Sequence, residues 1–84
     1  MDILEPTVEY KIYVKRSCPY CIASLKLLEE KNIKADIVYL GEPSYMSIQE
    51  FKTKFGQNAT VPRVYKNQKF LGGSVELRND IISS

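Results

Sequence analysis

Apolar and polar positions first alternate along this chain and then change to a helical period. Between residues 7 and 15 every second side chain is apolar, and most are β-branched or aromatic: Val8, Tyr10, Ile12 and Val14. This pattern predicts a strand over residues 7–15. Further along, four apolar side chains recur at helical spacing: Ile22, Leu25, Leu27 and Leu28. They predict an amphipathic helix that begins near Pro19 and ends at Lys31–Asn32.

The middle of the chain repeats this order of strand and helix. The apolar run over residues 35–40 predicts a buried parallel strand. Residues 41–44 predict a turn, with Ser44 as the N-cap of a second helix. Four apolar side chains at helical spacing trace that helix, which Gly56 would end: Met46, Ile48, Phe51 and Phe55.

A hairpin and a third helix complete the predicted order. Two short strand-like runs, residues 63–65 and 69–71, flank Asn67–Gln68, which predicts a hairpin turn. Gly72–Gly73 interrupts the chain before a last helix at about residues 74–82. The order β-α-β-α-β-β-α predicts an α/β fold with a mixed sheet. Both long crossovers are expected to give parallel pairings and the hairpin an antiparallel one.

Length and charge narrow the class of protein. The chain has 84 residues, of which 44% are hydrophobic, so we expect one globular domain over residues 1–84, with residues 1–6 as a loose lead-in. Twelve basic and ten acidic residues give a net charge of +2, which argues against nucleic acid as a partner. No run reaches the ~18 apolar residues that cross a bilayer. The first residues do not resemble a signal peptide, so we expect a cytoplasmic location and no membrane association.

Cys18 and Cys21 lie three residues apart where the first predicted strand gives way to the first helix. In a cytosolic chain such a pair indicates redox or metal chemistry. The unpaired N–H groups and the positive end of the helix dipole favour a thiolate at Cys18, and Lys15 and Arg16 add positive charge nearby. Cys21, one turn into the helix, suits the resolving role, in which it attacks a mixed disulfide on Cys18.

Two other interpretations of the cysteine pair stay open. The cysteines could be an inert pair in the core, or they could be half of a zinc site. A structural zinc site needs four ligands, and the chain has no third cysteine and no histidine. Carboxylates or a second chain would have to complete such a site, so no metal is predicted.

Three blocks, taken in this order, resemble the glutaredoxin family: Lys15-x-x-Cys18-Pro19-Tyr20-Cys21, Thr60-Val61-Pro62 and Gly72-Gly73. Cys-Pro-Tyr-Cys is the active-site signature of dithiol glutaredoxins, and the resemblance covers roughly residues 8–82. It implies a thioredoxin-like α/β fold with a four-stranded mixed sheet flanked by helices. It also implies an enzyme that reduces protein disulfides and glutathione mixed disulfides, with glutathione as reducing co-substrate and no bound cofactor.

The resemblance further implies where glutathione would bind. The Val61–Pro62 bond would be cis, which leaves the backbone of Val61, beside Thr60, free to pair with the cysteine portion of glutathione. The N–H groups of Ser74 and Val75, which follow Gly73, would receive the γ-glutamyl carboxylate.

Side chains would complete this glutathione site. Lys15 would pair with the glycine carboxylate, with Gln49 or Gln57 as a second contact, and Tyr20 would pack against the ligand. Val75 departs from the Ser, Thr or Asp of many relatives, so a side-chain bond to the γ-glutamyl group is missing there.

Three other functions remain open for this chain. One is a thioredoxin-like electron donor that a flavoprotein reductase reduces. Another is a dimer that carries an iron–sulfur cluster through Cys18 and glutathione, and the third is an interaction domain with idle cysteines. We expect the glutathione-dependent enzyme over these three alternatives, acting as a monomer on protein disulfides. Ribonucleotide reductase is the client that the resemblance suggests.

Overall fold

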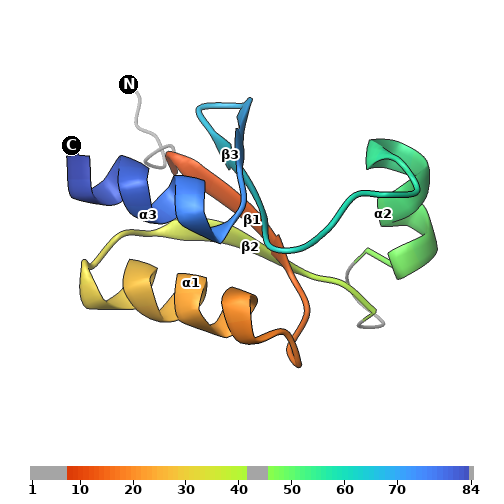
Figure 1. The fold of residues 1–84 in the computed structure, drawn as a ribbon, viewed down its shortest axis with the longest axis horizontal. Helices are drawn as coiled ribbons and strands as arrows, with labels where there is room; N and C mark the ends of the chain where they lie inside the picture. Colours follow the sequence, from red (N-terminus) through yellow and green to blue (C-terminus); the bar gives the residue numbers. More distant parts are fainter. Residues whose placement is uncertain (1–7, 42–45, 84) are drawn as a thin grey trace, which may run out of the picture.

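The computed structural model describes residues 8–41 and 46–83; the predicted lead-in at residues 1–6 and Ser44 lie outside the described residues. The order of elements is as predicted (Figure 1). In chain order the elements are β1 (Tyr10–Val14), α1 (Pro19–Glu30), β2 (Ala35–Tyr39), α2 (Ile48–Phe55), β3 (Arg63–Lys66), β4 (Lys69–Gly72) and α3 (Ser74–Ser83).

The four strands form one mixed sheet in the order β2-β1-β3-β4. β1 pairs in parallel with β2, so that Ile12 lies opposite Ile37. On its other side β1 pairs antiparallel with β3, where Ile12 lies opposite Val64. The β3–β4 hairpin turns at Asn67 and Gln68, both with positive φ, as the predicted hairpin requires.

The expectation that both long crossovers give parallel pairings is wrong for the second one. β3 runs antiparallel to β1 and does not pair with β2. The chain therefore leaves β2 and enters β3 at the same end of the sheet, and no crossover along the sheet is needed. Figure 1 shows α2 beyond this end, where it connects the two strands.

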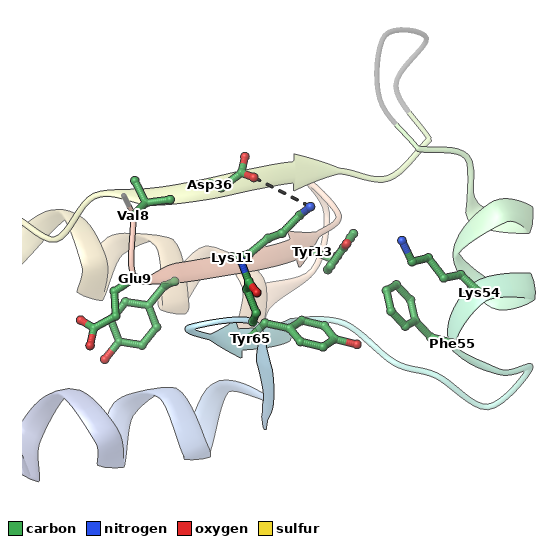
Figure 2. Close-up of a pocket in the computed structure, with 10 residues that line it drawn as sticks. Val8, Glu9, Lys11, Tyr13, Asp36, Lys54, Phe55 and Tyr65 are labelled. Carbon is green, nitrogen blue, oxygen red and sulfur yellow. Dashed lines mark ion pairs between the residues drawn. The ribbon is translucent and has the colours of Figure 1, made fainter. Parts of the chain in front are cut away.

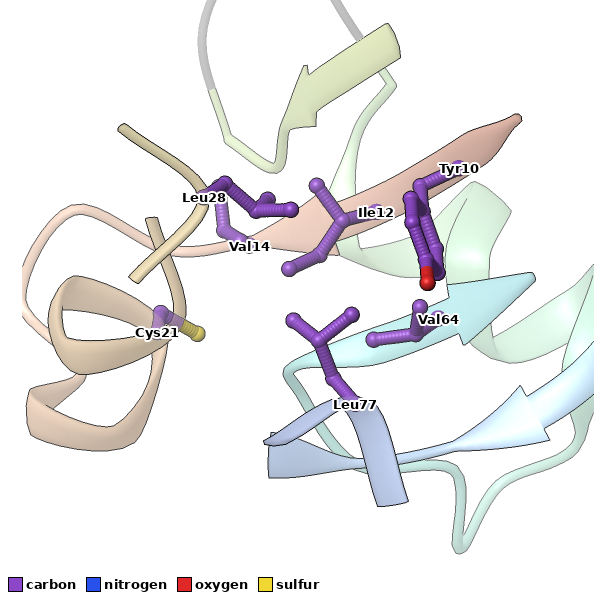
Figure 3. Packing of buried hydrophobic residues seen from close by; sticks show 7 residues of the cluster. All are labelled: Tyr10, Ile12, Val14, Cys21, Leu28, Val64 and Leu77. Carbon is purple, nitrogen blue, oxygen red and sulfur yellow. The ribbon is translucent and has the colours of Figure 1, made fainter. Parts of the chain in front are cut away.

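The main core lies between the sheet and the two helices α1 and α3. Alternate residues of β1 point toward these helices, and seven buried side chains form the cluster of Figure 3: Tyr10, Ile12, Val14, Cys21, Leu28, Val64 and Leu77. Val8, expected to continue the strand, lies before β1 and is 40% exposed. Leu77 is fully buried and joins α3 to the strands.

The buried face of α1 differs by one position from the predicted face. Cys21, Ser24 and Leu28 are buried, whereas Ile22 is 53% exposed. The polar Ser24 therefore takes a place in the inward stripe that an apolar period would assign to a hydrophobic residue. The helix ends as predicted, because Asn32 adopts a positive φ directly after its C-cap.

The helix α2 begins later than predicted. Its N-cap is Ser47, whose hydroxyl accepts from the N–H of Glu50, while the Glu50 carboxylate accepts from the N–H of Ser47. This reciprocal pair is a capping box. Ser44 is therefore not the N-cap, and Met46 precedes the helix.

A polar group holds the second half of α3 to the sheet. The Tyr10 hydroxyl donates to the Asp80 carboxylate, and Lys66 Nζ lies 2.8 Å from Asp80 Oδ2. Burial is the main cause that raises the pKa of Tyr10, and the hydrogen bond with Asp80 is the second. The hydrogen bond from Lys66 lowers the pKa of Asp80. These contacts help to fix α3, whose N-terminus borders the site described below.

The opposite face of the sheet carries a separate hollow of about 420 Å³ (Figure 2). The rings of Tyr13 and Phe55 meet there with centroids 5.1 Å apart, and Lys11 Nζ lies 3.9 Å from Asp36 Oδ2. No cysteine of the described residues lines this hollow. The chemistry of the cysteines therefore belongs to another part of the molecule.

Candidate active site

Cys18 is the N-cap of α1, at the start of the helix as predicted from the sequence. Its backbone is extended, with φ −89° and ψ 118°, and its N–H donates to the Lys15 carbonyl at 3.3 Å. Pro19 fits the next position because the first N–H groups of a helix have no partner within it. The Cys21 N–H donates to Cys18 Sγ at 3.3 Å, so the sulfur lies over the start of the helix.

The two cysteines differ in access and in proton affinity. Both are free thiols; Cys18 is half-buried and Cys21 is fully buried. Burial, reinforced by the hydrogen bond with Cys18, raises the pKa of the Cys21 thiol to about 12. A thiol is nucleophilic only after it loses its proton. Cys18 is therefore the sulfur that outside reagents can reach, and Cys21 stays protonated near neutral pH.

Alkylation of the reduced, folded protein near pH 8 is expected to modify Cys18 alone, because Cys21 is buried and stays protonated. Cys21 should react in the folded state only as the pH approaches its raised pKa of about 12. In urea both cysteines should react near pH 9, because an unfolded cysteine has a pKa of about 8.5. Peptide mapping by mass spectrometry measures the extent of alkylation at Cys18 and at Cys21. Equal rates at Cys18 and Cys21 in the folded protein would contradict the burial of Cys21.

The three sequence blocks come together around the Val61–Pro62 segment. The Val61–Pro62 bond is cis, as expected, and Cys18 Sγ lies 3.8 Å from the Val61 carbonyl oxygen. Gly73 approaches the same segment: a Cβ at this position would lie 3.5 Å from the Pro62 carbonyl oxygen. Residues far apart in the chain thus meet at this segment, with Cys18 against Val61 and Gly73 against Pro62.

A hollow of about 460 Å³ opens on one side of this centre and is called the lysine hollow here. Its lining includes four residues of the predicted site: Lys15, Gln57, Thr60 and Val61. Lys52 of α2 also lines it, and among the described residues no acidic side chain does. Gln49 is exposed and does not line the hollow, so the structure favours Gln57 of the two candidate amides.

Lys52 was missed by the sequence analysis for a topological reason. The predicted parallel crossover gave no reason to place this helix beside Val61. At the end of the sheet, α2 instead presents Lys52 to the hollow beside Val61. The helical period of α2 carries no signal for this placement.

A second hollow of about 660 Å³ lies between α1 and α3 and is called the helical groove here. Tyr20, Ser74 and Val75, three more residues of the predicted site, line one part of it. Tyr20 and Val75 are 68% and 63% exposed. The predicted glutathione contacts are therefore divided between two hollows. Lys15 lies in the first and Tyr20 in the second, on either side of Cys18 in sequence.

Glu76 is a further polar residue at the start of α3. Its Oε1 accepts from the Gly73 N–H at 2.7 Å, and this bond holds the pKa of Glu76 low. Gly72 has a φ of +141°, and a Cβ there would lie 2.5 Å from Glu76 Cγ. The sequence analysis did not single out Glu76, although its position three residues after Gly73 is the spacing of a capping residue. A carboxylate therefore lies beside Gly73, directly before the first residue of α3.

The described residues offer neither a metal-binding cluster nor a membrane-spanning helix. Within residues 8–41 and 46–83, no three or more His, Cys, Asp or Glu side chains are grouped so that they could hold a metal ion. No helix in the same ranges is both long and apolar enough to cross a bilayer.

Comparison with known proteins gives consistent matches in sequence. The sequence model of the glutaredoxin family matches residues 10–71. Glutaredoxin 1 of Rickettsia prowazekii is 32% identical over 68 residues, covering 81% of this chain and 72% of that protein. Mitochondrial glutaredoxin-2 of Rattus norvegicus is 35% identical over 66 residues, covering 77% of this chain and 42% of that protein. The chain spans 61% of glutaredoxin 1 of Rickettsia conorii.

Solved structures match in fold. Glutaredoxin 1 from Francisella tularensis, complexed with cacodylate, superposes with a TM-score of 0.70 at 26% identity, covering 89% of this chain and 96% of that chain. The buckwheat glutaredoxin–glutathione complex superposes with a TM-score of 0.69 at 22% identity, covering 89% of this chain and 69% of that chain. At that lower identity the likeness concerns the fold.

Proposed function

The chain belongs to the glutaredoxin family, and we propose that it is a thiol–disulfide oxidoreductase with glutathione as its reductant. We propose Cys18 as the nucleophile and Cys21 as the resolving cysteine. The observation that carries this proposal is the position of Cys18: it is half-buried at the start of α1, and its sulfur lies 3.8 Å from the Val61 carbonyl oxygen. A sulfur placed in this way can attack a disulfide that lies along the Val61 backbone.

With a glutathione mixed disulfide, Cys18 alone completes the reaction. Its thiolate attacks the glutathionyl sulfur, the substrate disulfide breaks, and the substrate thiol leaves with a proton. A glutathione thiolate then attacks the glutathionyl sulfur on Cys18. This second exchange forms glutathione disulfide and returns the Cys18 thiolate. The net result is that the substrate disulfide is broken and glutathione disulfide is formed.

With a protein disulfide, Cys21 is also needed. Cys18 attacks and forms a mixed disulfide with the client, whose first thiol leaves. The Cys21 sulfur then attacks Cys18 Sγ, and the client's second thiolate leaves and takes up the proton that Cys21 loses. The chain has no histidine to act as a base, so the departing thiolate is the acceptor we propose. Two glutathione molecules reduce the resulting Cys18–Cys21 disulfide and become glutathione disulfide.

The two hollows suit the two charged ends of glutathione. In the lysine hollow, Lys15 and Lys52 can receive the glycine carboxylate. At the start of α3, the N–H groups of Ser74 and Val75 can receive the γ-glutamyl carboxylate. The adjacent Glu76 carboxylate provides a partner for the γ-glutamyl ammonium group. The buckwheat protein, which shares the fold, was solved with glutathione, so glutathione is the first reductant to test.

Glutathione-dependent turnover tests this proposal. We expect the reduced protein to reduce the mixed disulfide of glutathione and β-mercaptoethanol when glutathione reductase regenerates glutathione. Lys15→Gln should raise the KM for glutathione about fivefold at nearly unchanged kcat, because one charge-assisted bond of about 1 kcal/mol is lost.

Lys34→Gln is the matched control, because Lys34 is exposed and does not line either hollow. An unchanged KM in Lys15→Gln would refute the role of Lys15. If the wild-type protein shows no turnover even at high glutathione, glutathione is not its reductant. The alternative, reduction by a flavoprotein reductase, would then be tested with the same disulfide substrates.

A further inference from the structure

The helical groove continues well beyond the residues proposed to contact glutathione. From Tyr20 it follows α1 as far as Lys31 and α3 as far as Ile82. Twelve helical residues rise about 18 Å, which corresponds to five or six residues of extended polypeptide. A glutathione molecule bound at Cys18 therefore accounts for only one end of this groove.

One stripe of each helix lines the groove at helical spacing. On α1 the stripe includes Tyr20, Ala23 and Leu27, and on α3 it runs from Val75 to Ile82. Three of these apolar side chains are largely exposed: Tyr20 at 68%, Val75 at 63% and Ile82 at 61%. The groove thus offers apolar contact area along its whole length.

The charged residues of the groove are mostly cationic. Lys26 and Lys31 of the α1 side and Arg78 of α3 line it, against a single carboxylate, Glu30. Within the described residues none of the three cations forms an ion pair. A partner that supplies carboxylates could therefore pair with them without breaking an existing ion pair.

We propose that the helical groove binds the segment of a client protein next to its reactive cysteine, and that this segment carries acidic and apolar side chains. The inference rests on the proposed function, because the client cysteine must reach Cys18. The groove begins at Tyr20, two residues after Cys18 in the chain. Its length suits a short extended segment of polypeptide. Its apolar stripes and its excess of positive charge determine the composition of the segment.

Peptide disulfides with different flanks test this proposal. The substrates are two peptides with the same internal Cys-Gly-Ser-Cys disulfide, flanked on both sides either by Asp-Leu-Glu-Leu-Asp or by Lys-Leu-Lys-Leu-Lys. We expect the wild-type protein to reduce the acidic peptide with a kcat/KM about tenfold higher, and this preference should shrink at high salt. The double variant K26E/R78E should lose the preference or reverse it.

The control variant K34E/K69E carries the same change in net charge on exposed residues outside the groove. It should keep the preference for the acidic peptide. Equal kcat/KM for the two peptides in the wild-type protein would overturn the proposal. Equal losses in K26E/R78E and K34E/K69E would do so as well, because net charge alone would then explain the preference.

The small glutathione mixed disulfide separates this proposal from the proposed function. Its turnover by K26E/R78E should stay within about twofold of wild type, because it presents no flanking segment to the groove. Turnover of this small substrate without any preference between the peptides refutes the groove alone. A wild-type protein that turns over neither the small substrate nor the peptides with glutathione refutes the proposed function itself.

Discussion

Serine in place of Cys18 is expected to reduce glutathione-dependent turnover by about 10³-fold or more, because the attacking sulfur is lost. A serine hydroxyl at the N-cap can still accept from the Cys21 N–H, so the helix should start in the same way. The loss should therefore appear in turnover and leave the free energy of unfolding nearly unchanged. The coupled glutathione reductase assay and urea unfolding measure the two quantities.

Cys21→Ser is the matched comparison for this loss. It should keep turnover of the small glutathione mixed disulfide within about threefold of wild type, because that reaction uses one cysteine. Reduction of the peptide disulfides should fall strongly, and the mixed disulfide between Cys18 and the peptide should accumulate. The opposite result, with activity dependent on Cys21 and independent of Cys18, would reverse the two roles.

Leu77→Ala is expected to lower the free energy of unfolding by roughly 2–5 kcal/mol. Leu77 is fully buried and meets residues of α1, β1 and β3 in the main core (Figure 3). A domain of this size has only about 3–5 kcal/mol of stability from its core, so the variant should be largely unfolded at 37 °C. Thermal and urea unfolding followed by circular dichroism measure this change.

Ile82→Ala is the control on the same helix, because Ile82 is 61% exposed. It should change the free energy of unfolding by no more than about 0.5 kcal/mol. If Leu77→Ala also cost less than this amount, α3 would not be part of the core that Figure 3 shows.

Local patterns in the sequence were sufficient to predict the order of the elements and the position of Cys18. The period of β1, the Asn67–Gln68 turn and the break at Gly72–Gly73 each depend on neighbouring residues, and the structure confirms them. The position of Cys18 at the start of α1 is local in the same sense.

The features that sequence analysis missed depend on packing between distant segments. β3 pairs antiparallel with the edge of β1 that faces away from β2. The order of elements along the chain specifies neither this edge nor this strand direction. Lys52 lines the lysine hollow beside Lys15 and Val61, which are distant from it in the sequence. Ser24 is buried and Ile22 is exposed, although the apolar pattern favours the opposite. The packing of α1 against the rest of the fold determines which stripe of the helix faces the core.

The difference between the two thiols belongs to the completed fold and has a consequence for synthesis on the ribosome. Cys18 and Cys21 leave the ribosome together, whereas Val64 and Leu77, which share the core with Cys21, follow more than forty residues later. Until those residues arrive, both thiols of the nascent chain are open to oxidants. We therefore expect that chains stalled before Val64 are oxidised at both cysteines, and that released chains are oxidised first at Cys18.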